Sequence, residues 1–381
     1  MIPSLLIKNA NMYNVFTGET DVGDIYVERG VVKRVCRDIT EKAAFTADAG
    51  GYIITPGLVD THVHLFHDSI YFGIDPQKYI LPSGVTYAID QGTAGADNYS
   101  EFQKRVLFST DLRYKTTLHC SRIGIPYTID GPGELFDLNN LDRKAAVEAY
   151  RRYKDDIVGI KIRLTPNICP QNAKEALAAA VAIAEELSLP LVVHPNHAEM
   201  TSGELYSTLR GGDVVTHSFV DSHIGLIGDD GKIKECVSNA RARGVIFDTG
   251  HGFTSLSFKV LRAALEQGFY PDTISTDLHQ ANYQGPVYDL PTTISKFLCL
   301  DVPFFDAIKM CTVNPVEIFS LKDKQLGIEE GKPADFAAFE LKRGDFTYND
   351  SFGNELRGEY KLVPVFTVLG EKLFFNRGRD A

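Results

Sequence analysis

Short apolar runs alternate with helix-spaced patterns from about residue 55 to about residue 324. Each run is four or five residues long, which suits a strand buried inside a fold. We count eight of them, at residues 58–62, 85–89, 117–120, 158–162, 191–194, 213–217, 245–248 and 273–277. The clearest helical pattern lies at residues 172–187, where apolar residues recur at i, i+4, i+7 and i+10: Leu177, Val181, Ala184 and Leu187.

The order of these elements predicts an α/β fold. Eight strands with intervening helices over about 270 residues match a (β/α)8 or TIM barrel, and a doubly wound parallel sheet is the alternative. Several runs end on residues that can bind a metal: His62 and His64, Lys161, His194, His217 and Asp277. A barrel brings the C-terminal ends of its strands to one face, where barrel enzymes carry out their chemistry. The barrel therefore explains this placement, and the doubly wound sheet does not.

The two flanking segments are strand-like. The apolar runs in them are 5–7, 24–27 and 31–35 before the barrel, and 326–328, 335–339 and 362–368 after it. Each flank has only about 55 residues, which is thin for an independent core. We expect the flanks, residues 1–54 and 325–381, to combine into one small β-sandwich beside a barrel formed by residues 55–324.

Composition limits the partners. The chain has 381 residues, with 39 Lys or Arg and 50 Asp or Glu, so its formal net charge is −11. Such an acidic chain is a poor nucleic-acid or anionic-membrane binder. We expect neither a signal peptide nor a membrane span, because no apolar run approaches about 20 residues. The six dispersed cysteines favour reduced thiols and a cytoplasmic location. We expect a small-molecule substrate and a homo-oligomer.

The His62-Val63-His64 pair is the first sign of chemistry. Alternate residues of a strand point to the same face, so both imidazoles converge on one side, as a metal site requires. Two core or surface histidines without a metal are the plain alternative.

The context of this pair resembles a known family. Residues 56–64, Pro-Gly-Leu-Val-Asp-Thr-His-Val-His, are similar to the first-strand signature of the amidohydrolase superfamily, which is metal-dependent. The later positions of that family's pattern follow in order, one on each of four further strands: Lys161, His194, His217 and Asp277. Residues 18–30 and 326–335 resemble the two ends of the family's β-sandwich.

A narrower resemblance is to the deacetylase-type amidohydrolases, which remove acetyl groups from acylated hydroxy acids and related compounds. It rests on residues 159–163, 247–252, 285–290 and the second-strand loop 90–96, where Gln91 and Thr93 are variants without an assigned role. Dihydroorotases often carry an arginine two residues after the histidine pair, and here Phe66 stands at that position. This counts against a dihydroorotase.

The resemblance implies two divalent metal ions, with zinc as the expected metal. His62, His64 and Asp277 would hold one ion, and His194 and His217 the other. Lys161 would be an N6-carboxylysine that bridges them, since burial lowers a lysine pKa from about 10.4 and leaves an amine able to react with CO2. Asp277 would be the catalytic residue, taking a proton as general base and returning it as general acid.

The function that follows is hydrolysis of a small acylated compound by attack of a metal-bridging hydroxide. Deacetylation of an N- or O-acetyl acid, through an amide or an ester bond, is the leading form. The alternatives are a dihydroorotase-like cyclic-amide hydrolase, a mononuclear deaminase, which would not need Lys161, and a non-catalytic scaffold.

Three residues are candidates for binding substrate: Arg163, His251 and Tyr288. Arg163 follows Lys161 by two positions, so both side chains would share a strand face, and its planar fork suits a carboxylate. Its alternative role is an ion pair with a nearby acid. His251 and also His279 lie just past strand ends and could face the substrate.

Overall fold

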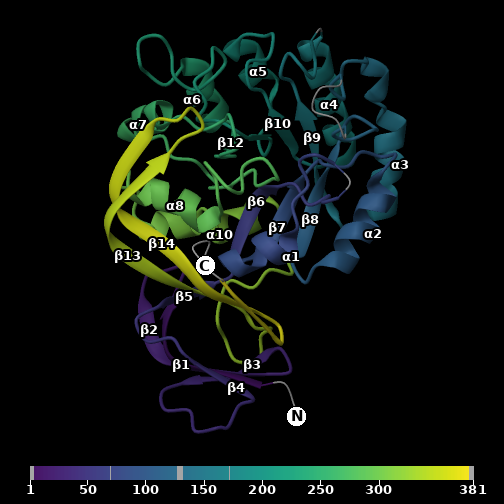
Figure 1. The fold of residues 1–381 in the computed structure, drawn as a ribbon. Helices are drawn as coiled ribbons and strands as arrows, with labels where there is room; N and C mark the ends of the chain where they lie inside the picture. The colour runs from purple at the N-terminus through teal and green to yellow at the C-terminus, as the bar shows by residue number, and fades with distance from the viewer. Residues whose placement is uncertain (1–3, 69, 127–131, 171, 377–381) are drawn as a thin grey trace.

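The computed structural model describes residues 4–68, 70–126, 132–170 and 172–376. Its centre is a curled parallel sheet of seven strands (Figure 1). In chain order the strands are β6 (Leu58–Val63), β7 (Val85–Gln91), β8 (Arg113–His119), β9 (Ile157–Arg163), β10 (Leu191–His194), β11 (Val214–Val215) and β12 (Ile246–Phe247), and each pairs with the next. These strands confirm seven of the eight predicted runs, and they form the barrel of an α/β fold.

The eighth run, residues 273–277, is not a regular strand, so that prediction is wrong in detail. Isolated bridges join Thr273 to Asp248 beyond β12 and Leu278 to Val63 of β6, which places this segment between the two edge strands. Its backbone is irregular because its hydroxyl groups serve buried carboxylates. Thr273 and Ser275 donate to Asp248, and Thr276 donates to Asp60 at 2.5 Å.

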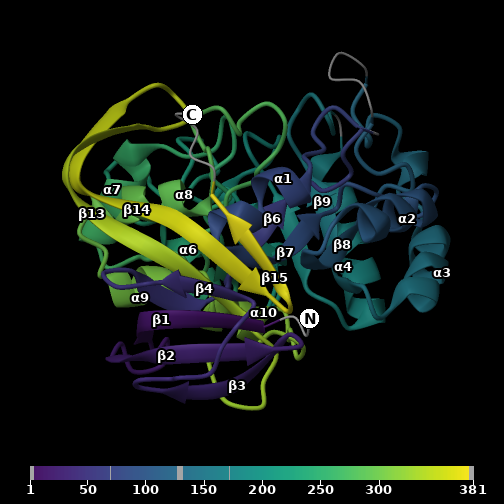
Figure 2. The same cartoon turned by 60° about the horizontal axis from the view of Figure 1, so that its bottom comes forward.

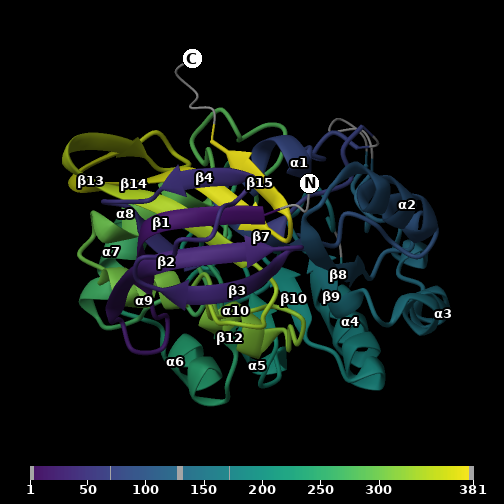
Figure 3. The same cartoon turned by 90° about the horizontal axis from the view of Figure 1, so that it is seen from below.

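Helices surround the sheet, as the view from below shows (Figure 3). They are α1 (Pro76–Tyr79), α2 (Tyr99–Ser109), α3 (Arg143–Tyr153), α4 (Ala173–Leu187), α5 (Ser202–Thr208), α6 (Glu235–Ala242), α7 (Phe258–Glu266), α8 (Leu290–Leu298), α9 (Phe304–Lys309) and α10 (Val313–Ile318). Helix α4 confirms the pattern at residues 172–187, and its buried face includes Leu177 and Ala184. Within the described ranges, no helix has the length and apolarity to span a membrane.

Both flanks of the barrel contribute to a second sheet (Figure 2). Its strands are β1 (Ser4–Tyr13), β2 (Thr20–Glu28), β3 (Val31–Cys36), β4 (Phe45–Asp48), β5 (Ile53–Pro56), β13 (Asp335–Asn349), β14 (Glu355–Leu369) and β15 (Lys372–Phe375). Their order is β15-β14-β13-β5-β1-β2-β3, with β4 beside β1. The joint is the antiparallel pairing of β5 with β13. The expectation that the two ends of the chain build one β unit is confirmed.

The apolar run at residues 326–328 is not a strand, contrary to prediction. Ile328 packs against the core of the terminal sheet, and Leu326 packs against the barrel core. These residues are apolar because they cover two cores, rather than because they alternate along a strand.

A buried ion network fixes β13 to the barrel. The Asp335 carboxylate accepts hydrogen bonds from Thr86 Oγ1 at 2.5 Å, Lys324 Nζ at 2.7 Å and Arg113 Nη2 at 2.8 Å. Thr86 lies in β7 and Arg113 in β8. The start of the long β13–β14 hairpin is therefore held at the barrel end opposite the C-terminal ends of the strands.

Candidate metal centre

A cavity of about 550 Å³ lies at the C-terminal ends of the barrel strands. Its lining residues are His62, His64, Tyr71, Phe72, Lys161, Arg163, Thr165, Asn167, Ile168, His194, Phe253, Thr254, Ser255, Asp277, His279 and Ala281. Five of the six predicted metal ligands are among them. The sixth, His217, is buried behind the wall with its ring 4.2 Å from that of His194 and 5.0 Å from that of His62, centre to centre.

Three of the predicted ligands meet at one point. The Nε2 atoms of His62 and His64 lie 3.3 and 3.1 Å from the same oxygen, Asp277 Oδ1. The ligand atoms of all three residues lie within 4.8 Å of one another. This is the donor set that the sequence analysis assigned to the first metal ion.

Two of the predicted ligands have an unusual backbone conformation. His217 has φ 59° and Asp277 has φ 52°, the left-handed region that residues with a Cβ rarely adopt. Residues held in such conformations concentrate at functional sites. The chain turns sharply at both positions, and both side chains thereby reach the cluster.

Hydrogen bonds determine which nitrogen of each imidazole faces the cluster. His62 Nδ1 lies 2.9 Å from Thr216 Oγ1, and that hydroxyl donates to Asp248 Oδ2 at 2.7 Å. A hydroxyl has a single proton, so Nδ1 of His62 must carry the hydrogen and the lone pair is on Nε2.

The imidazoles of His64 and His217 are oriented by similar contacts. His64 Nδ1 lies 2.8 Å from Thr93 Oγ1, which donates to Asp90 Oδ2 at 2.7 Å. His217 Nδ1 donates to the carbonyl oxygen of Gly250 at 2.6 Å. In each residue Nε2 is left free as a metal ligand, and such outer partners are typical of metal-binding histidines.

Burial keeps these imidazoles neutral. It lowers the pKa of His64 to about 3 and of His217 to about 4, and it lowers the pKa values of His62 and His194 well below their usual value. All four rings are therefore unprotonated near pH 7, which is the form that binds a metal ion.

Lys161 lies fully buried in the same cluster, and its Nζ has no hydrogen-bond partner. Burial lowers the pKa of this amine to about 7, although Asp277 and Asp248 act in the opposite direction. The chain also leaves room for its stem, because a Cβ at Gly92 would lie 2.5 Å from Lys161 Cβ. Much of the amine is therefore neutral near pH 7.

These observations fit bound divalent ions. The lone pairs of His62 and His64 point at one carboxylate oxygen, an arrangement that a cation between them would stabilise. His217 Nε2 and Lys161 Nζ are buried without partners, which is costly for a polar atom. Imidazole nitrogens and carboxylate oxygens are ligands that Zn²⁺ accepts.

Arg163 lies at the cavity and is also engaged in an ion pair. Its Nε and Nη2 donate to the two oxygens of Glu134 at 2.6 and 2.7 Å, and Glu134 is fully buried. His119 Nε2 lies 3.0 Å from Glu134 Oε1. Two of the five guanidinium hydrogens are used in this way, and three remain for other partners.

Glu134 is a site residue that the sequence analysis missed. It lies outside every strand and helix, in the connection between β8 and α3, and no motif contains it. Thr93 and Thr216 were not assigned a role either. The one sequence signal for Thr93 is that it is a variant within the loop 90–96, which resembles the second-strand loop of the deacetylase-type amidohydrolases.

The other two predicted substrate residues are not among the cavity's lining residues. His251 is buried with its Nε2 2.5 Å from Lys296 Nζ. Tyr288 is 40% exposed in the loop after the cis peptide of Gly285 and Pro286. His279 does line the cavity, and its Nδ1 accepts from the amide of Ala281 at 3.2 Å, so Nε2 carries the proton.

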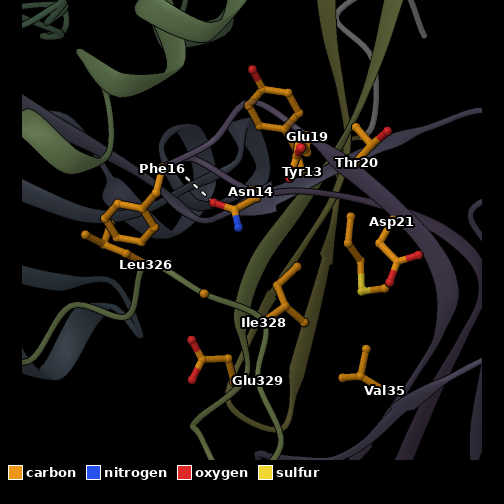
Figure 4. Close-up of a pocket in the computed structure, with 12 residues that line it drawn as sticks. Tyr13, Asn14, Phe16, Glu19, Thr20, Asp21, Val35, Leu326, Ile328 and Glu329 are labelled. Carbon is orange, nitrogen blue, oxygen red and sulfur yellow. Dashed lines mark hydrogen bonds between the residues drawn. The ribbon is translucent and has the colours of Figure 1, made fainter.

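A second pocket, of about 330 Å³, lies on the terminal sheet (Figure 4). Phe16, Glu19, Leu326 and Glu329 are among its lining residues, and Asn14 Oδ1 accepts from the Phe16 amide at 2.9 Å. Its lining contains no His, Lys or Cys. The histidines and the lysine of the predicted site therefore lie at the barrel cavity and not at this pocket.

Comparison with known proteins agrees with this geometry. Residues 53–365 match the amidohydrolase family, which is most of the chain. The chain belongs to the amidohydrolase family. A deacetylase of Agrobacterium fabrum is 34% identical over 323 residues, covering 85% of this chain and 79% of the relative. A deacetylase of Enterococcus faecalis is 31% identical over 377 residues, covering 98% of this chain and 99% of the relative.

Solved structures of other amidohydrolases share the fold over the whole chain. One described as a dihydroorotase is 30% identical with a TM-score of 0.89, covering 98% of both chains. One described as an adenine deaminase is also 30% identical, with a TM-score of 0.88, covering 98% of this chain and 99% of the other. The chain is therefore a hydrolase of this family, and its relatives span three reactions.

The orientation of His64 yields a test of the amidohydrolase site. Thr93→Val removes the hydroxyl that holds Nδ1, so zinc affinity should fall by about 10- to 100-fold, the usual cost of losing such an outer partner. Thr93→Ser keeps the hydroxyl and should bind zinc as the wild type does. Competition with a chromogenic chelator measures both. A Thr93→Val protein with wild-type affinity would contradict the role given to this contact.

Proposed function

We propose that this amidohydrolase is a binuclear metal-dependent deacetylase of small acylated acids. The observation that supports it best is the convergence of His62, His64 and Asp277 on one point, with unpartnered Lys161 and the His194–His217 pair in the same cluster. This arrangement offers two donor sets and one buried amine.

The residues divide as follows. His62, His64 and Asp277 would hold one ion, and His194 and His217 the other. Lys161, once carboxylated, would provide an oxygen to each. When bound, two zinc ions lower the pKa of a water between them and polarise the carbonyl of the substrate.

Asp277 is placed to move the proton. Its Oδ1 faces the two imidazoles, and its Oδ2 lies on the other side, where a Cβ at Gly252 would come within 2.7 Å. Asp277 lines the cavity, so a leaving group within it is in reach. In this proposal the carboxylate accepts the proton of the attacking water and then passes it to the departing nitrogen or oxygen.

Arg163 would bind the carboxylate of the substrate. The clamp by Glu134 uses the Nε edge of the guanidinium and holds its plane fixed. The three remaining hydrogens, two on Nη1 and one on Nη2, form the outer fork that pairs with a carboxylate. The two roles considered for Arg163, an ion pair with an acid and binding of the substrate carboxylate, are then compatible. The ion pair orients the guanidinium that binds the substrate.

The competing activities have less support. A mononuclear deaminase needs no bridging lysine, and here Lys161 is buried within the donor cluster. The position at which dihydroorotases often carry an arginine holds Phe66, whose ring packs 5.4 Å from that of Phe102 in the core. The proposal also includes a cytoplasmic location and an assembly of identical chains.

A substrate panel tests the proposal directly. Zinc-loaded protein is offered N-acetyl and O-acetyl acids in both stereochemical series, together with dihydroorotate and adenine. We expect acetate release from acids of one series and no turnover of the last two compounds. Turnover of adenine or dihydroorotate without acetate release from any acid would overturn the deacetylase proposal.

Asp277→Asn tests the proton shuttle. An amide cannot carry the proton, so kcat should fall at least about 10²-fold. The amide oxygen can still reach a metal ion, so zinc content measured by elemental analysis should be largely retained. If the variant keeps its turnover, another group carries the proton, with His279 next in line at the cavity.

The role of Arg163 needs a paired variant. Arg163→Met alone would leave Glu134 buried with only His119, so it is combined with Glu134→Gln. For an acetylated acid, kcat/KM should fall about 10- to 100-fold, the cost of losing hydrogen bonds to a charged group. The neutral amide of the same acid should lose much less. Glu134→Gln alone is the control, and equal losses on acid and amide would leave Arg163 a structural role.

A further inference from the structure

The β13–β14 hairpin is longer than its sheet requires. Only residues 336–339 of β13 pair with β5, whereas β13 continues to Asn349 as a two-stranded ribbon with β14. Such a ribbon is marginally stable on its own in water. It runs up the side of the barrel from the terminal sheet towards α7 (Figure 1). The ribbon packs on α8, where Leu362 N donates to Ser295 Oγ at 2.9 Å and Leu356 and Leu362 are buried in the barrel core.

The far end of the hairpin is bonded to the loop of residues 250–256. Ser351 N donates to the carbonyl of Leu256 at 3.0 Å, and Leu256 N donates back to Ser351 Oγ at 3.1 Å. The Ser351 hydroxyl also reaches the carbonyl oxygens of His251 at 3.2 Å and Gly252 at 3.0 Å. One side chain thus contacts three backbone positions of this loop.

A neighbouring carboxylate adds a further bond. Asp350 Oδ2 accepts from the amide of Phe258, the first residue of α7, at 3.0 Å. Asp350 Oδ1 accepts from the amides of Phe352 and Asn354 and so shapes the tip itself. The hairpin tip, residues 349–352, is hence both ordered and attached.

A buried lysine completes the attachment. Lys296 of α8 is fully buried, which lowers the pKa of its amine to about 7, and in its ammonium form it has three hydrogens to donate. Three acceptors meet it: Asn349 O at 2.9 Å, Pro286 O at 2.8 Å and His251 Nε2 at 2.5 Å. His251 is thereby fixed with its Nδ1 hydrogen towards Gly252 O at 2.9 Å. This histidine joins the loop to the hairpin.

The loop held in this way is a wall of the cavity. Phe253, Thr254 and Ser255 line the cavity, and Gly252 passes so close to Asp277 that a Cβ there would lie 2.7 Å from Oδ2. A shift of the loop by a few tenths of an ångström would change both the space for substrate and the surroundings of this carboxylate.

We propose that the hairpin tip, residues 349–352, is a positioning element for the cavity wall 250–256, with Ser351 as its central positioning residue. The terminal β unit would then take part in substrate binding without touching the substrate. The kinetic part of this proposal rests on the proposed function.

Ser351→Ala tests it in two ways. Amide hydrogen exchange should accelerate several-fold at His251 and Gly252, whose amides donate to Ser275 O at 3.1 Å and Thr276 O at 3.0 Å, because the wall loses its anchor. For the acid turned over fastest in the substrate panel, kcat/KM should fall about 3- to 10-fold, mostly through KM, in keeping with the loss of a hydrogen bond. Zinc content and Tm should stay near wild type.

Two further variants serve as controls. Ser351→Thr keeps the hydroxyl and should restore both exchange and KM. Arg343→Met removes the exposed ion pair with Glu359 on the same hairpin, 2.8 Å long and away from the tip, and should change neither. Wild-type exchange at the wall in Ser351→Ala overturns the proposal, and so does faster exchange with unchanged KM. The exchange measurement needs no substrate, so its failure is distinct from failure of the deacetylase proposal.

Discussion

Two buried carboxylates, those of Asp90 and Asp248, lie behind the histidines of the site, and the orientation of those histidines depends on them. Asp90 accepts a hydrogen bond from the Thr93 hydroxyl and Asp248 accepts one from the Thr216 hydroxyl, each at 2.7 Å. The hydroxyl then has only a lone pair to offer the imidazole, which must turn its Nδ1 hydrogen towards it. The Nε2 lone pairs of His62 and His64 are left facing one carboxylate oxygen. A bound cation would stabilise this arrangement.

One of these carboxylates, Asp248, also explains why the barrel is irregular where it closes. Asp248 is also bonded by the hydroxyls of Thr273 and Ser275, which belong to the segment in the eighth strand position. Isolated carboxylates are expensive to bury, and several donors around one offset that cost. The segment makes these side-chain bonds and lacks the regular backbone hydrogen bonds of a strand. It ends at Asp277, which has a left-handed backbone conformation. The segment that closes the barrel therefore also positions the metal-ligand candidate Asp277.

The sequence predicted the parts of the fold that rest on apolar patterning. Seven strands and helix α4 bury apolar faces whose spacing is readable, and the ends of the chain combine because neither has a core of its own. The pattern failed at residues 273–277 and 326–328, because hydroxyl chemistry decides the first segment and the packing of two cores decides the second.

The same limit applies to the site. The six predicted ligands stand in a recognisable order at the ends of successive strands, so they could be named in advance, and the structure brings them together. Glu134, Thr93, Thr216 and Ser351 are common residue types that act through partners far away in sequence. His251 was named for its place after a strand, but its ring turns away to Lys296, a contact that only the folded chain reveals.

The central claim is that these residues hold two metal ions bridged through Lys161, and zinc stoichiometry tests it most directly. Metal-free protein is loaded with zinc and bicarbonate, passed through a desalting column and measured by elemental analysis, beside Lys161→Met prepared in the same way. The account predicts about two ions per chain for the wild type and a clear loss in the variant, because the bridge is gone. Two ions in Lys161→Met, or no retained zinc in the wild type, would contradict it.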